Sequence, residues 1–268
     1  MLAVAALAWL GGMAQTPAPT PLDRARAAFI ARQYDAAIVA AREALQTPAL
    51  VNPAAVVLAR AHLERFRLED SREDLAHARE ALATVRAAAL QPRDEVAFFM
   101  AQGLLLYFDG CAAGCLSAAA EMFALALTRV PSGAHDDRDV IFEWWAGSLD
   151  RQAQFGPEAD RPLLYRRLLA GADAELAAHQ QTASASYWVA AAARGVGDFE
   201  RAWGAAIAGW VRAREYGERG AHLRADLDRL VTQVLLPERA RALAADADAR
   251  PVLDRLLAEW DEIKKKYP

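Results

Sequence analysis

The sequence predicts an all-α protein in which antiparallel helix hairpins stack into a right-handed array, with further helices closing its C-terminal end. Three observations support this prediction. Apolar residues recur at spacings of three and four along most of the chain, which is the period of one face of an α-helix. The alternation of Val, Ile and Thr that marks half-buried strands is absent. Gly, Pro and Asp interrupt the helical pattern at the points where turns are expected.

The clearest hairpin lies in residues 184–213, SASYWVAAAARGVGDFERAWGAAIAGWVRA. Gly197 tolerates the backbone angles that end one helix, and Asp198 can cap the next one. On the second helix, the small residues Ala202 and Gly209 leave room for a facing helix to approach closely. The segment therefore predicts two helices joined by a tight turn.

Earlier segments carry helix signals of the same kind. Thr20 stands before a first-turn proline, which is typical of a helix start. Ser71 with Asp74 resembles a capping box in which Asp replaces the usual Glu. Residues 96–108 are apolar nearly all round, and Gly103 stands in their middle, where glycine costs roughly 1 kcal/mol relative to alanine. A close helix crossing at Gly103 would justify that cost.

The hairpins resemble the tetratricopeptide (TPR) repeat, and residues 117–131 and 199–213 match it best. In residues 117–131, the small, aromatic, small, apolar and proline positions of the family are filled by Ala119, Phe123, Ala126, Leu127 and Pro131. Equivalent crossing points recur at intervals of 34, 44, 44 and 43 residues when successive positions are subtracted, and the first interval equals the TPR period. These points are Ala25, Ala59, Gly103, Gly147 and Ala190. The resemblance implies degenerate repeats over residues 21–216.

The remaining segments complete the domain organisation. Residues 1–14 are an apolar run too short for the roughly 20 residues that span a bilayer, so they predict a signal peptide and export to the periplasm or the extracellular space. The alternative is a buried amphipathic helix, in which case the protein is cytoplasmic. Residues 15–20 form a proline-containing linker, and residues 217–268 predict helices that cap the stack. We expect no membrane span in the mature chain.

Composition narrows the class of partner. Hydrophobic residues make up 54% of the 268 residues, which is ample for a core. Charged residues make up 25% and the formal net charge is −4. A nucleic-acid-binding protein usually shows a concentrated basic surface, so this balance argues against one.

Cys111 and Cys115 are the only cysteines of the sequence. In an exported protein two cysteines this close predict a disulfide, and free thiols are the main alternative.

No group of residues has the spacing of a known metal or cofactor site. The densest group of possible ligands runs from His135 through Asp136 and Asp137 to Asp139, but a solvated loop that caps the next helix explains it more simply. The other histidines lie on separate predicted helices, where packing or surface roles are expected; they are His62, His77, His179 and His222. The sequence therefore predicts no metal and no cofactor.

The sequence also lacks the known catalytic motifs. It contains no Gly-x-Ser-x-Gly nucleophile motif, and no glycine-rich phosphate loop follows a predicted strand. These absences favour a non-enzymatic scaffold that binds a protein or peptide. The alternative is an enzyme or metal-dependent accessory protein with a site assembled from distant residues around His135 and Asp139.

Aromatic and Arg side chains supply the candidate binding residues. The TPR resemblance implies that the first helix of each pair lines a concave surface, and these residue types dominate binding energy at interfaces. The candidates on successive first helices are Tyr107, Trp144, Arg151, Tyr187 and Arg194. The alternative is that these aromatic rings fill the core.

Overall fold

The computed structural model describes residues 18–110, 113–180, 182–245 and 247–268. Within these ranges the chain is helical and contains no β-strand, which confirms the all-α prediction. The predicted signal peptide, residues 1–14, and part of the linker lie outside the described residues. No helix in the described ranges is long and apolar enough to cross a bilayer.

The described residues form thirteen α-helices. In chain order these are α1 (Pro21–Ile30), α2 (Tyr34–Ala44), α3 (Val51–Glu69), α4 (Arg72–Ala83), α5 (Pro92–Phe108), α6 (Ala113–Leu127), α7 (His135–Phe155), α8 (Arg161–Ala178), α9 (Ala185–Gly195), α10 (Phe199–Arg212), α11 (Gly217–Leu230), α12 (Leu236–Ala244) and α13 (Arg250–Lys266). A π-helical stretch, Val231–Leu235, joins α11 to α12. Short 3₁₀ turns occupy several of the other connections.

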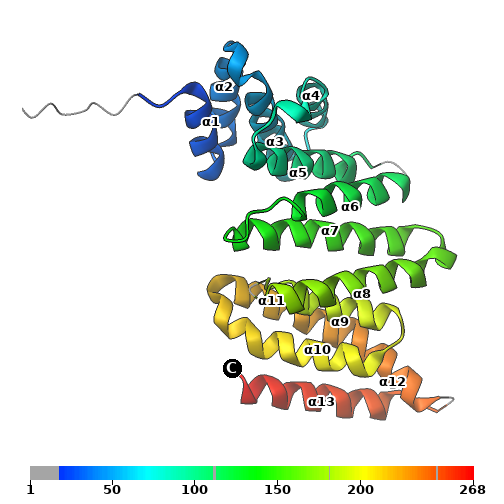
Figure 1. Ribbon diagram of the computed structural model, residues 1–268. Coiled ribbons are helices and arrows are strands. Elements are labelled where there is room, and N and C mark those ends of the chain that lie inside the picture. Colours follow the sequence, from blue (N-terminus) through cyan, green and yellow to red (C-terminus); the bar gives the residue numbers. More distant parts are fainter. Residues whose placement is uncertain (1–17, 111–112, 181, 246) are drawn as a thin grey trace, which may run out of the picture.

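Neighbouring helices pack against each other in chain order. In Figure 1 the helices form successive layers of one stack, with α1 and α2 at one end and α13 at the other. A second set of contacts joins alternate helices, from α1 to α3, α3 to α5, α5 to α7, α7 to α9 and α9 to α11. These six helices therefore share one face of the stack, which we call the odd-helix face.

Local signals explain where several helices begin. Thr20 caps α1, because its side chain accepts a hydrogen bond from the Asp23 backbone while the Asp23 carboxylate accepts one from the Thr20 backbone. Gly197 has a φ of +81°, and the Asp198 side chain accepts a hydrogen bond from the Arg201 backbone at the start of α10. Both predicted helix starts are confirmed.

The predicted capping box at the start of α4 is wrong. Ser71 is the N-cap residue, but its side chain makes no capping hydrogen bond. The Asp74 side chain turns into the protein instead, where it is 1% exposed and pairs with His62 and Arg65. Charged partners on α3 outcompete the local backbone for this carboxylate, because charge-assisted hydrogen bonds in a buried site are the stronger ones.

The predicted close crossing at Gly103 is confirmed. A Cβ atom at this position would lie 2.5 Å from Cε1 of Phe123, on the facing helix α6. Phe123 is fully buried, so its ring has little room to move. Glycine is therefore required here by the approach of α5 and α6 rather than by any unusual backbone angle.

The C-terminal helices cover the last hairpin of the stack. Trp260 of α13 is fully buried, and its ring centroid lies 5.6 Å from that of Trp203 and 5.3 Å from that of Trp210, both on α10. The Trp260 indole N–H donates a hydrogen bond of 2.8 Å to Asp228. Helix α13 thus closes the apolar side of α10.

Candidate functional site

Three hollows open on the odd-helix face, and odd-numbered helices supply almost all of their lining. The first, with a volume of about 640 Å³, lies between α1, α3, α5 and α7 and also touches the loop before α7. The second, about 540 Å³, lies between α7, α9 and α11, and the third, about 450 Å³, between α5, α7 and α9. The second and third share Glu143, Trp144 and Trp188, so we treat them as one aromatic groove.

Four of the five predicted binding residues line this aromatic groove. Tyr107, Trp144 and Arg151 line the third hollow, and Tyr187 lines the second. The ring centroids of Tyr107 and Trp144 lie 5.1 Å apart in an edge-to-face arrangement. The Arg151 guanidinium sits 4.8 Å from the Tyr107 ring centroid, within the range of a cation–π contact. The structure thus brings four side chains from α5, α7 and α9 together.

Arg194, the fifth predicted residue, lies outside the three hollows. Its guanidinium is 6.0 Å from the Tyr165 ring centroid and its Nε is 3.4 Å from a Glu238 carboxylate oxygen. These contacts tie α9 to α8 and α12. A partner-binding role for any of the five residues stays a prediction.

Trp144 belongs to the core and to the groove at once. Its ring stacks on the fully buried Phe123 at 6.3 Å and meets Phe108 edge-on at 5.6 Å. It is nevertheless only half-buried and lines both hollows of the groove. Tyr187 is also half-buried, and burial, followed by the nearby Asp150 charge, raises the pKa of its hydroxyl to about 12. Trp144 and Tyr187 are therefore partly core residues and partly groove residues, so neither of the two alternatives raised by the sequence holds alone.

The second hollow also gathers acidic groups. Asp139, Glu143 and Asp226 line it together with His222. Glu143 keeps contact with solvent, but the protein around it desolvates its carboxyl group and, with the charges of Asp139 and Asp226, raises its pKa. The indole N–H of Trp188 opposes this shift by donating a 3.3 Å hydrogen bond to Glu143.

The sequence suggested an alternative site around His135 and Asp139, and of these two side chains the structure describes only that of Asp139. The Asp139 carboxylate accepts hydrogen bonds from the backbone N–H and the hydroxyl of Ser184, and lies 3.5 Å from Arg219. The side chain of His135 lies outside the described residues. The alternative site around His135 and Asp139 is thus described only in part.

The first hollow combines apolar walls with a cation that forms no direct ion pair with any described residue. Arg60 of α3 is half-buried, and its guanidinium lies 4.5 Å from the Phe29 ring centroid. Burial lowers its pKa, although the nearby charges of Glu64 and Asp137 oppose this shift. Its Nε has no hydrogen-bond partner, and it forms no ion pair with any described residue. Arg93, which is exposed at the same hollow, is unpaired within the described ranges too. Arg26, by contrast, is paired with Asp94 at 2.6 Å.

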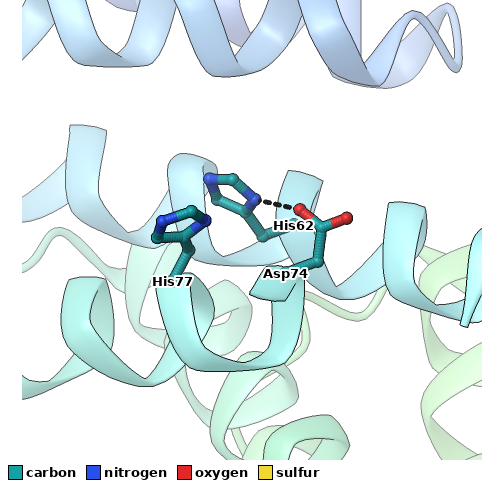
Figure 2. Close-up of side chains that lie close together, drawn as sticks. All are labelled: His62, Asp74 and His77. Atoms are coloured by element: carbon teal, nitrogen blue, oxygen red, sulfur yellow. Dashed lines mark hydrogen bonds and ion pairs between the residues drawn. The ribbon is translucent and has the colours of Figure 1, made fainter. Parts of the chain in front are cut away.

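A second cluster of polar side chains joins α3 to α4, away from the three hollows. In Figure 2 the imidazoles of His62 and His77 lie close to the carboxylate of Asp74. His62 Nδ1 is 2.5 Å from Asp74 Oδ1, and the two imidazole centroids are 5.0 Å apart. Burial alone would raise the pKa of Asp74, but hydrogen bonds from Arg65 and His62 hold it below the usual value. Burial has the opposite effect on the imidazole, and it lowers the pKa of His62.

The predicted disulfide falls partly outside the described residues. Cys115 lies near the start of α6, while Cys111 is one of residues 111 and 112, which the structure does not describe. Pairing of these cysteines therefore stays a prediction.

Sequence reasoning missed both Arg60 and the His62–His77 pair. A signal for the pair existed, because the two histidines lie at nearly equal distances on either side of the turn at Asp70. Residues placed symmetrically about the turn of a helix hairpin face each other. Arg60 had no comparable signal, because whether an arginine finds a carboxylate depends on helices that are far away in sequence.

No family model matches this chain, and neither do any curated proteins or solved structures.

Proposed function

We propose that this protein is a non-enzymatic scaffold that binds a polypeptide segment along the odd-helix face of a TPR-like, right-handed array. The observation that carries the proposal is the placement of all three hollows on that one face, from α1 to α11. The alternate-helix contacts support the TPR-like arrangement, since stacked helical hairpins expose their first helices on one extended surface. A peptide lying across these helices would contact the hollows in succession.

The aromatic groove suits an apolar or basic segment of the peptide. Tyr107 and Trp144 offer rigid ring area at its floor, which is the kind of surface that contributes most to binding energy. Glu143 and Asp226 add carboxyl groups to the same groove, whereas the Asp139 charge is met by Arg219, 3.5 Å away. A Lys or Arg of the peptide would complement the carboxyl groups of Glu143 and Asp226.

The first hollow suits an acidic residue of the peptide. The half-buried Arg60 guanidinium loses hydration and gains no direct ion pair, and the charges of Glu64 and Asp137 offset this loss only in part, since its pKa is still lowered. A carboxylate of the peptide could supply the missing hydrogen bonds to Arg60, and the apolar lining, which includes Phe29 and Val57, could take a neighbouring apolar side chain. The bound segment would thus carry acidic and apolar residues at α1–α5 and basic residues at α7–α11.

Substitution of Arg151 by glutamate tests the groove. Peptides selected from a random display library against the full chain should bind the Arg151→Glu variant about tenfold more tightly, because the change removes a cation that repels the basic segment and adds a carboxylate that attracts it. Fluorescence anisotropy with the synthetic selected peptides measures this. Arg166→Glu on α8 is the matched control, since Arg166 is exposed, unpaired among described residues and away from the odd-helix face. Equal binding to both variants, or no selected peptide, would contradict the proposal.

Replacing Arg60 by methionine separates binding from stability. We expect the Arg60→Met variant to be about 1 kcal/mol more stable in urea unfolding, because an unpaired, half-buried charge is replaced by an apolar chain of similar length. Acidic peptides should at the same time lose affinity. Arg93→Met is the control, and its stability should change by less than about 0.5 kcal/mol because Arg93 is exposed. A less stable Arg60→Met protein would mean that Arg60 serves the fold.

One observation favours an enzyme as the second candidate. The second hollow brings His222 together with Glu143, and the raised pKa of Glu143 is a property of many general acids. Turnover of chromogenic ester, phosphate or glycoside substrates that is lost in Glu143→Gln would support this candidate.

A further inference from the structure

The His62–Asp74–His77 cluster lies between the two helices of one hairpin and does not depend on the proposed peptide site. Asp74 and His62 are each only 1% exposed. One possible ligand atom from each of the three residues lies within 4.8 Å of the other two. Figure 2 shows the three side chains converging from α3 and α4.

The hydrogen bonds of Asp74 determine which nitrogen of His62 carries a proton. Arg65 donates to both carboxylate oxygens of Asp74, at 2.9 Å and 2.5 Å, so this carboxylate acts as an acceptor. His62 Nδ1, 2.5 Å from the same carboxylate, must then be the donor. The proton on Nδ1 leaves the Nε2 atom of neutral His62 with a free electron pair.

His77 has a similar arrangement on the other side. Its Nε2 lies 4.0 Å from a Glu73 carboxylate oxygen, which is too long for a hydrogen bond, although this nearby negative charge favours the tautomer with the proton on Nε2. Its Nδ1 then carries the electron pair. His77 Nδ1 and His62 Nε2 are both buried, and neither has a hydrogen-bond partner among the described residues. Two buried acceptors without a donor are costly, so each requires a partner that the protein does not itself provide.

We propose that His62 Nε2 and His77 Nδ1 bind a borderline divalent cation, represented by Zn²⁺, with Asp74 orienting His62 from the far side. Neutral imidazole is a preferred ligand of zinc and of other late first-row metals. A carboxylate that accepts the second N–H of a metal-binding histidine is the usual support of such ligands. A single cation would satisfy both orphan nitrogens at once.

The site is open enough to be loaded. The His77 side chain is 34% exposed, while that of His62 is 1% exposed. A cation can therefore enter from the His77 side, and water can complete its coordination there. Two protein ligands with water in the other positions make a site of moderate affinity that exchanges metal with solution.

Titration of the untagged, chelator-treated full chain with Zn²⁺ tests the proposal. Isothermal titration calorimetry should give one bound equivalent. The His77→Gln variant should bind at least about tenfold more weakly, since loss of a ligand should cost no less than loss of a supporting hydrogen bond. His222→Gln is the control, because His222 is an exposed histidine on the distant helix α11, and its affinity should be unchanged. No binding, or equal binding by His77→Gln, would overturn the proposal and leave water as the partner of the two nitrogens.

A second measurement uses the chain without substitutions, so its result does not depend on whether a variant folds. Diethyl pyrocarbonate modification followed by peptide mass spectrometry should show that Zn²⁺ protects His77 while His222 reacts as before. Equal modification of His77 with and without Zn²⁺ would also overturn the proposal.

Discussion

Replacing Trp260 by alanine is expected to destabilise the protein by about 3–5 kcal/mol, which is the range for large aromatic side chains removed from a core. Trp260 is fully buried, contacts two other indole rings on α10 and donates a hydrogen bond to Asp228. The variant loses the ring, leaves a cavity and removes one of the two hydrogen bonds that the Asp228 carboxylate accepts, while the one from Lys264 remains. Urea unfolding followed by circular dichroism at 222 nm measures the loss.

Trp260→Phe is the matched control for that experiment. It keeps an aromatic ring but lacks the indole N–H, so it should lose only about 1–3 kcal/mol. A change below about 1 kcal/mol in Trp260→Ala would show that α13 is not an integral part of the stack. The closing role of the C-terminal helices would then be wrong.

Replacing Gly103 by alanine is expected to cost about 2 kcal/mol, even though alanine is the better helix former by roughly 1 kcal/mol. The new methyl group would lie 2.5 Å from the Phe123 ring, which is buried and held by Trp144. Either α5 and α6 separate or Phe123 moves. Since Phe123 supports Trp144, the aromatic groove should also change, and the tryptophan fluorescence spectrum of the folded variant should shift.

Gly204→Ala provides the control for the effect of helix propensity. Gly204 lies in α10, is exposed, and has no atom within 4 Å of the position that a Cβ would take. This change should stabilise the protein by up to about 1 kcal/mol. If both variants became more stable, the close crossing at Gly103 would not be a tight contact.

The sequence was sufficient where the interactions are local. The cap at Thr20, the turn at Gly197–Asp198 and the succession of helices follow from residues a few positions apart, whose backbone angles and hydrogen bonds depend little on the rest of the chain. Gly103 could be anticipated because its cost within a helix needs a compensating contact. The aromatic candidates could be placed on successive first helices by the same periodicity, and four of them do line one groove.

Only the tertiary structure determined which side chains pair with or pack against each other across the helix interfaces. Asp74 reads as a local cap, but His62 and Arg65 on the preceding helix hold it inward. Arg60 forms no direct ion pair with any described carboxylate, although the charges of Glu64 and Asp137 act on it from a distance. The Trp144 ring packs against Phe123 and also lines the groove. Such outcomes depend on how far each helix is rotated and how closely it approaches its neighbours, and packing across the whole stack determines both.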